Sequence, residues 1–568
     1  MTVYPMKTKH TLILTILLAM GVSVSGCAFL RGYAEGQSDT MASIEKRPPA
    51  ESTLAAAQFL FEDFGSLNTD TLNTNAIPWK VAVAAVLVEK LGDTSSASIE
   101  DFNNILKQFG FIFPDNIVTY QGTLAIPIPK SPIGMIKGTI ARSIPTVKLE
   151  VSNLGCASCH AGRLYDKQGM PTNTLYPGLP NTSLNLDEYI QTVYTSMKNV
   201  LRRPDAVVAM MKRVFPDITK DELTTIEKYV FPKVKARYKE LEAGIDAPLP
   251  FQNGGPGITN GVGALKLRLG IVSMDKKAGE YGYTSIPDLG GTLFRSSLLY
   301  DGVYSTPGKP AFQDIKASDI NARHRDNLAV ITAFFTVPTM GVSPTKARVA
   351  IPKVKHVYQF IQHYQPPAFP GKIDLTLARM GAHIYQQQCA ECHGRYAEWT
   401  DDTVLTTPLR LTELPNKLVA SADIGTDPYR AATIDVIFAD AVNHSAYGDY
   451  VKAIPMNGYA AKPLSALWAT APYLHNGSVP TLWALMNPQQ RPEKFYVGGH
   501  RLDYDNMGIA YRADKNGIMV YPEGYKPWST PMLYDTTLPG RSNKGHEKEF
   551  ESLTSAEKKQ LMEFLKLL

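Results

Sequence analysis

The chain has 568 residues, of which 44% are hydrophobic, and a formal net charge of +5. This small charge, without a strong basic run, argues against nucleic acid as a partner. The length accommodates two or three domains, and the 42 glycines and 40 prolines indicate much irregular, loop-rich structure.

The first 27 residues are predicted to be a lipoprotein signal peptide. A basic stretch precedes the apolar run Thr11–Val24, which has the length of a signal-peptide core and is short for a bilayer span. The sequence Val24–Cys27 (VSGC) resembles a bacterial lipoprotein cleavage box, after which Cys27 would carry the lipid. An ordinary secretory signal, with Cys27 as a stray thiol, is the alternative. We therefore expect a protein on the periplasmic side of a bacterial membrane, anchored by its acyl chains, with residues 28–52 as a flexible tether.

Residues 53–140 are predicted to form an N-terminal helical extension. Ala55–Phe64 is rich in apolar residues, and Val81–Leu91 fits a helix that is buried on one side. A capped helix start follows at Ser98, with Gly110 near the end of that helix.

Cys156–His160 (CASCH) is the most specific motif of the first half. C-x-x-C-H attaches a c-type haem: the thiols of Cys156 and Cys159 add to the haem vinyl groups, and His160 becomes the proximal ligand of the iron. Chance would supply such a motif in roughly one chain in a thousand of this composition. A zinc half-site would need further ligands at knuckle spacing, and a redox dithiol does not require the trailing histidine.

The surroundings of this motif differ from those of a minimal cytochrome c. Ile144–Leu154 is rich in β-branched residues and predicts an extended segment before the motif. Residues 186–245 predict several helices, one of them over Pro204–Phe215. This insertion either covers a haem or packs away from it. Asp326–Val337 predicts the terminal helix of this half.

Cys389–His393 (CAECH) is a second haem motif, with Cys389 and Cys392 as its thiols and His393 as its proximal histidine. Four of the five cysteines lie in the two motifs, so no pair remains for a structural disulfide. The sequence therefore predicts two covalently bound haems c, each with its iron.

The setting of the second motif is conventional. Leu375–His393 predicts a helix that runs into the motif, and Thr554–Leu567 predicts an amphipathic terminal helix. Gly381 and Tyr385 are placed for close contact with that terminal helix. We predict a mainly α fold with two cytochrome c-like haem domains, long irregular loops and helical insertions. Its parts after the extension are a first haem domain with the insertion, a proline-rich linker and a second haem domain, at residues 141–345, 346–371 and 372–568.

Four further segments resemble the bacterial di-haem cytochrome c peroxidase superfamily, which includes the di-haem rubber oxygenases and the enzyme that matures tryptophan tryptophylquinone. These segments are Tyr300–Gly302, Pro472–Ser478, Phe495–Gly498 and Asn543–His546. The last two are closer to the rubber-oxygenase branch than to the short peroxidases. The resemblance implies a di-haem redox enzyme.

Two departures from the family pattern concern the chemistry. Tyr300 stands where the family commonly has a tryptophan that relays electrons between the haems, so a relay role for Tyr300 is a hypothesis. The segment after it, residues 303–319, contains no glutamate to match the acid/base residue of the peroxidases. His475, within the segment Pro472–Ser478, is expected to be structural or to form a hydrogen bond near a haem propionate or the ligand loop.

The sixth ligand of each iron decides function, because six protein ligands favour electron transfer, whereas an open position binds peroxide or O₂. For the second haem the resemblance favours His546, with Met486 and Met456 as competing ligands. The alternative for His546 is that it is an exposed surface histidine and no ligand. For the first haem we expect an open or weakly water-ligated position, with Met340 and His324 as alternatives.

These features together predict an oxidoreductase in which the second haem transfers electrons and the first reacts with peroxide or O₂. A small periplasmic electron donor or acceptor is the expected redox partner. The alternative is a pure electron-transfer cytochrome in which both haems are six-coordinate.

Overall fold

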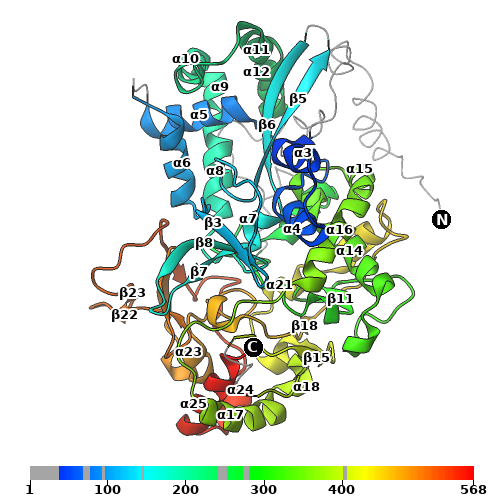
Figure 1. Cartoon of the computed structure of the whole chain (residues 1–568), viewed down its shortest axis with the longest axis vertical. Coiled ribbons are helices and arrows are strands. Elements are labelled where there is room, and N and C mark those ends of the chain that lie inside the picture. The colour runs from blue at the N-terminus through cyan, green and yellow to red at the C-terminus, as the bar shows by residue number, and fades with distance from the viewer. Residues whose placement is uncertain are drawn as a thin grey trace, which may run out of the picture.

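The computed structural model describes residues 37–67, 77–92, 96–143, 146–240, 252–272, 281–400 and 406–568. The predicted signal peptide, Cys27 and residues 28–36 of the predicted tether lie outside these ranges. The molecule is elongated, with the helices of the insertion at one end and the C-terminal helices at the other (Figure 1). No helix among the described residues is both long enough and apolar enough to cross a bilayer.

The prediction of a mainly α fold is wrong. The described residues are 42% helical and 16% strand, and their strands form eight small sheets. Many strands are only two residues long, such as β9 (Ile258–Thr259) and its antiparallel partner β10 (Thr284–Ser285). Segments this short carry no alternating apolar pattern, so the sequence does not reveal them.

The segment predicted as a tether is folded from residue 37 onwards. Strand β1 (Gln37–Ser38) pairs antiparallel with β5 (Met135–Ser143), and helix α3 (Asp39–Glu45) buries Met41 and Ile44. Helix α4 (Glu51–Phe61) then joins the largest apolar core. The tether prediction failed because the segment is mostly polar, and its few buried apolar residues, such as Met41 and Ile44, form no pattern that the sequence reveals.

The predicted extension contains the three expected helices: α4 covers most of Ala55–Phe64, and α5 (Trp79–Leu91) and α6 (Ile99–Gln108) follow. Ser98 and Asp101 form a capping box at the start of α6, as its sequence predicts. The same region also supplies strands, so it is not purely helical; they are β2 (Ile77–Pro78), β3 (Asn116–Thr119), β4 (Gly122–Thr123) and most of β5.

The first haem motif lies between two sheets. Strand β6 (Thr146–Leu154) pairs with β5 along its whole length and leads into the helical turn α7 (Cys156–Cys159), which confirms the predicted extended segment. The chain leaves the motif as β7 (Ala161–Tyr165) and returns as β8 (Pro171–Pro177) in a sheet of order β4-β3-β8-β7. Strands before and after α7 therefore fix its position.

The insertion is helical, as predicted. Its elements are α8 (Leu186–Met197), α9 (Asn199–Arg202), α10 (Pro204–Val214), α11 (Lys220–Thr225), the π-helical turn η2 (Ile226–Val230) and α12 (Phe231–Glu240). They share a second apolar core with α5 and α6. Helix α10 begins at Pro204, where proline is favoured because its missing N–H would be unpaired anyway.

The segment predicted as a linker is largely helical. It contains the last two residues of α15 (Pro344–Ala347) and all of α16 (Ile351–His363). Helix α16 packs against α14 (Ala322–Thr336), the predicted terminal helix of the first half, and against α4. Its prolines lie at the start of these helices and in the irregular stretch after them, so they do not mark a flexible connection.

The second motif follows α17 (Leu375–Gln388) and lies in the short helix α18 (Ala390–His393). Helix α17 packs against α25 (Ser555–Leu565), as predicted. A Cβ on Gly381 would lie 2.0 Å from the Gln560 carbonyl oxygen, so only glycine permits this approach. The rings of Tyr385 and Phe564 lie 5.0 Å apart between their centres.

Two small sheets join the halves of the chain. In the first, β12 (Tyr304–Ser305) pairs with β11 (Ser297–Leu298) and with β17 (Lys452–Ala453). In the second, β15 (Leu411–Leu414) pairs with β13 (Ile315–Lys316) and β14 (Arg395–Tyr396).

The remaining elements are short. The helices are α13 (Gly261–Arg268), α20 (Ser421–Ile424), α21 (Tyr429–Ala432), α22 (Val436–Asn443), α23 (Leu482–Met486) and α24 (Glu547–Glu551). The strands are β16 (Leu418–Ala420), β18 (Gly458–Ala460), β19 (Lys494–Val497), β20 (Leu502–Asp503), β21 (Gly508–Ile509), β22 (Arg512–Ala513), β23 (Met519–Val520) and β24 (Met532–Asp535). Single 3₁₀ turns are η3 (Thr292–Phe294), η4 (Ala317–Asp319), η5 (Pro338–Met340), η6 (Arg348–Ala350), η7 (Leu467–Ala469) and η8 (Pro488–Gln490).

Candidate haem sites

The backbone of the first motif is clamped by local hydrogen bonds. The Ser158 hydroxyl donates to the carbonyl oxygens of Gly134 and Gly155, at 2.9 and 2.8 Å. Gly134 has a φ of +81°, and a Cβ there would lie 2.0 Å from the Ser158 nitrogen. The β5–β6 hairpin therefore holds the turn that carries both thiols, Cys156 and Cys159.

The His160 imidazole is oriented by a backbone carbonyl. Its Nδ1 lies 3.1 Å from the carbonyl oxygen of Pro287, so Nδ1–H is the donor and Nε2 keeps its lone pair. Burial lowers the pKa of His160 to about 4, which keeps the ring neutral at physiological pH. A neutral imidazole fixed through its other nitrogen is the usual form of a metal-ligating histidine.

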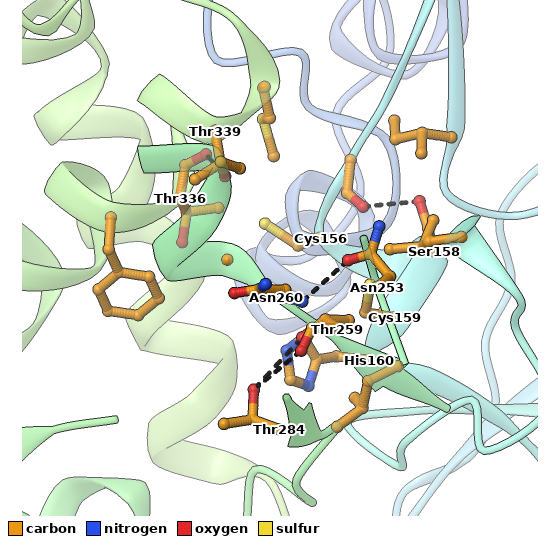
Figure 2. Close-up of a pocket in the computed structure, with 18 of the residues that line it drawn as sticks. Cys156, Ser158, Cys159, His160, Asn253, Thr259, Asn260, Thr284, Thr336 and Thr339 are labelled. Carbon is orange, nitrogen blue, oxygen red and sulfur yellow. Dashed lines mark hydrogen bonds between the residues drawn. The ribbon is translucent and has the colours of Figure 1, made fainter. Parts of the chain in front are cut away.

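A cavity of about 810 Å³ adjoins Cys156, Cys159 and His160. Figure 2 shows the motif on one wall and Thr336 and Thr339, from the end of α14 and from η5, on the facing wall. Side chains of α8 and α12, including Tyr189 and Val234, also line it. The insertion therefore lines the cavity beside the first motif. This favours the prediction that it covers a haem over the alternative that it packs away from one.

The lining of this cavity fits a haem. Arg295 is buried and donates to the Leu299 carbonyl oxygen at 3.0 Å, while its Nε has no partner among the described residues. Burial lowers the pKa of Arg295 to about 10, so it remains a cation that a carboxylate such as a haem propionate would pair. Asp288 is the one carboxylate among the described lining residues, and it follows Pro287, on the His160 side.

The two proposed alternatives for a sixth ligand of the first haem lie in different places. Met340, which is 9% exposed, lines the cavity, and its carbonyl oxygen accepts a hydrogen bond from Asn153. His324 lies at the start of α14 with its Nε2 2.8 Å from the Leu293 carbonyl oxygen, and it is not among the described residues that line the cavity. The structure thus brings Met340, but not His324, to this site.

The second motif repeats the arrangement of the first. The Nδ1 of His393 lies 2.7 Å from the carbonyl oxygen of Lys462, which again leaves Nε2 available. Burial lowers the pKa of His393 to about 4. The Tyr385 hydroxyl donates to the Gly394 carbonyl oxygen at 3.0 Å and so ties the end of the motif to α17.

His546 lies opposite His393. Their ring centres are 6.3 Å apart, and the ring planes differ by 24°. A ligating imidazole nitrogen lies about 2 Å from its metal, and the ring centre lies about 1 Å behind that nitrogen. Two histidines on opposite faces of one iron therefore have ring centres about 6 Å apart. The measured separation fits this arrangement.

The loop that carries His546 is held by Arg491, a residue that the sequence did not single out. Its guanidinium donates to the carbonyl oxygens of Asn543 and Gly545, at 2.6 and 2.9 Å, and pairs with Glu547 at 2.7 Å. His546 itself has a φ of +64°, and burial lowers its pKa to about 4. Its Nδ1 is buried with no hydrogen-bond partner in the described part of the chain.

The competing methionines lie in apolar cores. Met486 is 1% exposed on α23, in the core of the second half. Met456 packs against the core built by α4, α14 and α16. The ring that faces His393 is that of His546.

A short polar link connects the two motifs. The Tyr300 hydroxyl lies 2.7 Å from Ser285 Oγ and accepts from Lys462 Nζ at 3.3 Å. Ser285 lies two residues before Pro287, the partner of His160, and the carbonyl of Lys462 is the partner of His393. Tyr300 therefore lies between the segments that orient the two proximal histidines.

His475 lies beside this link. It is 7% exposed, its Nε2 lies 3.1 Å from the Tyr459 hydroxyl, and its ring stacks on that tyrosine with 4.2 Å between ring centres. Its ring centre is 6.5 Å from that of Tyr300. Asp301, next in sequence to Tyr300, forms a buried ion pair with Arg430 at 2.7 Å.

Two motifs with oriented proximal histidines define a haem-binding site of the cytochrome c type. A family model described as RoxA-like, cytochrome c-like matches residues 458–496, which contain Lys462 and the segment Pro472–Ser478. This match supports a cytochrome c-type protein with covalently bound haem and is consistent with a haem oxidoreductase.

Two uncharacterized proteins of Sinorhizobium fredii (strain NBRC 101917 / NGR234) are similar to this chain. The protein y4iJ is 29% identical over 233 residues, 32% of this chain and 36% of that protein. The protein y4iM is 29% identical over 222 residues, 34% of this chain and 46% of that protein. The chain thus matches less than half the length of each of these curated relatives.

Proposed function

We propose that this protein is an exported, lipid-anchored di-haem c-type cytochrome that acts as an oxidoreductase. Its second haem transfers electrons, and its first haem is the peroxide- or O₂-reactive site. The observation that carries the proposal is the asymmetry of the two sites: His546 faces His393 at 6.3 Å, whereas a cavity of about 810 Å³ adjoins His160.

The residues of the two motifs would hold the cofactors. Cys156 and Cys159 form the thioether bonds of the first haem, and Cys389 and Cys392 form those of the second. His160 and His393 ligate the irons through Nε2, and His546 completes the second site. When bound, the haems supply one-electron transfer at the six-coordinate iron and activation of O₂ or peroxide at the open one.

The lining of the first cavity supports O₂ chemistry on a hydrophobic substrate over peroxide cleavage. Peroxide cleavage uses an acid/base residue beside the open iron position. The described lining has Asp288 as its one carboxylate, and its connection to Pro287 puts it on the side of His160. Apolar groups such as Phe335, Met197 and Ile361 supply much of the remaining wall.

Tyr300 is proposed to relay electrons between the haems. Its phenol can carry a hole, and it links Ser285 with Lys462, which lie next to the segments that hold His160 and His393. The Lys462 ammonium lies 5.1 Å from the centre of the Tyr300 ring.

Spectroscopy of the full-length, haem-loaded protein tests the proposal. We expect one low-spin and one high-spin ferric signal in electron paramagnetic resonance (EPR), and CO binding to one of two haems after reduction. Low-spin signals alone in every redox state, with no CO or cyanide binding, would falsify the oxidoreductase function and support the pure electron-transfer alternative.

The lipid anchor at Cys27 and the periplasmic redox partner are separate parts of the proposal. Cys27→Ser is expected to move the haem-loaded protein from the membrane fraction to the soluble periplasmic fraction, because the acyl chains would no longer be attached. A variant that stays with the membrane, although it is cleaved and haem-loaded, would contradict lipidation at Cys27.

A further inference from the structure

A tyrosine and a partly buried carboxylate form a close pair beside the first motif. The Tyr364 hydroxyl lies 2.5 Å from Asp288 Oδ2. Asp288 follows Pro287, whose carbonyl accepts the hydrogen bond of His160. The pair therefore lies next to the segment that orients the proximal histidine.

Asp288 is built as a proton acceptor. Its Oδ1 accepts hydrogen bonds from Ser465 Oγ at 2.6 Å and from the Gly290 N–H at 2.7 Å, while Oδ2 accepts from Tyr364. These three donors match the acceptor capacity of an ionised carboxylate. Burial raises the pKa of Asp288 above its ordinary value, so the carboxylate binds a proton more readily than an exposed aspartate does.

The Tyr364 ring is fitted against the backbone of the motif. A Cβ on Gly178 would lie 2.1 Å from Cε2 of Tyr364, and Gly178 has a φ of +100°. The Gly178 N–H donates to the His160 carbonyl oxygen at 2.8 Å. Glycine at position 178 therefore permits the phenol to contact the segment that is hydrogen-bonded to His160.

A second tyrosine leads from this pair towards the surface. The ring centre of Tyr176 lies 6.2 Å from that of Tyr364, and the Tyr176 hydroxyl donates to the Gln365 carbonyl oxygen at 2.7 Å. Both rings line a small surface pocket together with Tyr120, which is 42% exposed. The order Asp288, Tyr364, Tyr176, Tyr120 thus runs from the first haem site to solvent.

We propose that Tyr364, with Asp288 as its base, is a redox-active site that takes an oxidising equivalent from the first haem and passes it to a small one-electron donor, of the phenol or hydroquinone class, at the Tyr120–Tyr176 pocket. This inference rests on the proposed function, because it needs a first haem that reacts with an oxidant. Hydrogen peroxide serves as the oxidant in this step, because it carries two oxidising equivalents and reacts without the organic substrate that O₂ chemistry needs.

The step balances in atoms and electrons. Reduction of hydrogen peroxide to two water molecules takes two electrons, one from Tyr364 and one from the reduced second haem, and two protons from solvent. Tyr364 loses its electron as its O–H bond breaks, and the proton passes to Asp288 Oδ2. The products are a neutral tyrosyl radical and a protonated carboxyl group. An electron from the donor then restores Tyr364, and the proton returns from Asp288.

The test uses the full-length protein with one electron on its second haem, one equivalent of hydrogen peroxide and rapid freezing. We expect a tyrosyl radical signal in EPR that narrows when the tyrosines carry ring deuterium. Tyr364→Phe is expected to lower this signal at least tenfold. Asp288→Asn is expected to lower it severalfold, because the amide cannot accept the phenolic proton. Tyr504→Phe is the matched control: this tyrosine is not among the described residues that line the cavity, and its hydroxyl donates to the Asp166 carbonyl oxygen at 2.7 Å instead of to a carboxylate, so its loss should leave the signal intact.

The outcomes separate this inference from the function on which it rests. If neither peroxide nor O₂ reoxidises the second haem in the unsubstituted protein, both are overturned; if only O₂ does, the Tyr364 site alone is overturned. If reoxidation occurs but the radical signal is absent, or persists undiminished in Tyr364→Phe, only the Tyr364 site is overturned. Hydroquinone added before freezing should quench the radical, and more slowly in Tyr176→Leu; equal rates would rule out the exit through Tyr176.

Discussion

His393 and His546 show how far a single pair of residues determines the chemistry of a haem. An imidazole on each face makes an iron six-coordinate and lowers its potential relative to methionine and histidine ligation. The supports of this pair are backbone carbonyls and one buried arginine: Lys462 orients His393, and Arg491 holds the loop of His546.

Replacing His546 by methionine tests its role directly. In His546→Met we expect the potential of the second haem to rise by on the order of 0.1–0.2 V, a fraction of the range that axial ligands set. Spectroelectrochemical titration measures the shift, and the loss of the bis-histidine EPR signal is the second readout.

The matched control is His444→Met, since His444 is exposed and its Nδ1 bonds within its own helix to the Asp440 carbonyl oxygen. An unchanged potential in His546→Met, with the haem still attached, would assign the sixth position to another residue.

The residues proposed to carry the haems are identified in the sequence itself, whereas the groups that orient the two histidines are not. The C-x-x-C-H spacing is local, so the sequence identifies Cys156–His160 and Cys389–His393. The carbonyls of Pro287 and Lys462 belong to no motif, because any residue type offers a carbonyl. The buried state of Arg491 is likewise invisible, since arginine is most often exposed.

At the scale of the element, helices with a regular apolar face were predicted well. Helices α17 and α25 pack together as their patterns indicate. The two-residue strands, the folded part of the supposed tether and α16 in the supposed linker were missed. These elements depend on partners far away in the chain, such as β5 for β1, and have little pattern of their own.

The close contact between α17 and α25 predicts a large loss of stability when even a small side chain is added at Gly381. Gly381→Val should destabilise the second half by about 1–3 kcal/mol or more, because its Cβ would lie 2.0 Å from the Gln560 carbonyl oxygen and the helices must separate. The temperature at which the second haem loses its low-spin signal measures this effect. His383→Val, at an exposed position of the same helix, should cost only a few tenths of a kcal/mol. Equal losses in both variants would show that the close approach is unimportant.

At the scale of the whole molecule, the two halves are interdependent. They share small sheets, as β12 and β17 do, and the N-terminal helix α4 packs against the first motif. Asp301 of the first half and Arg430 of the second form an ion pair whose side chains are 0% and 2% exposed. The sequence suggested separate haem domains, because it does not show contacts between distant segments.

Breaking this ion pair should therefore loosen both halves together. Asp301→Asn leaves the Arg430 cation buried without its carboxylate, and we expect a loss of about 3–5 kcal/mol. Thermal unfolding, followed at both haems, should show both transitions shifted down by similar amounts. In the double variant Asp301→Leu with Arg430→Met, much of the stability should return, because no buried charge remains unpaired.

The control is an exposed ion pair: Glu100→Gln, which breaks the pair with Lys107, should cost less than about 1 kcal/mol. A shift confined to one haem in Asp301→Asn would mean that the halves unfold independently and that the pair does not couple them.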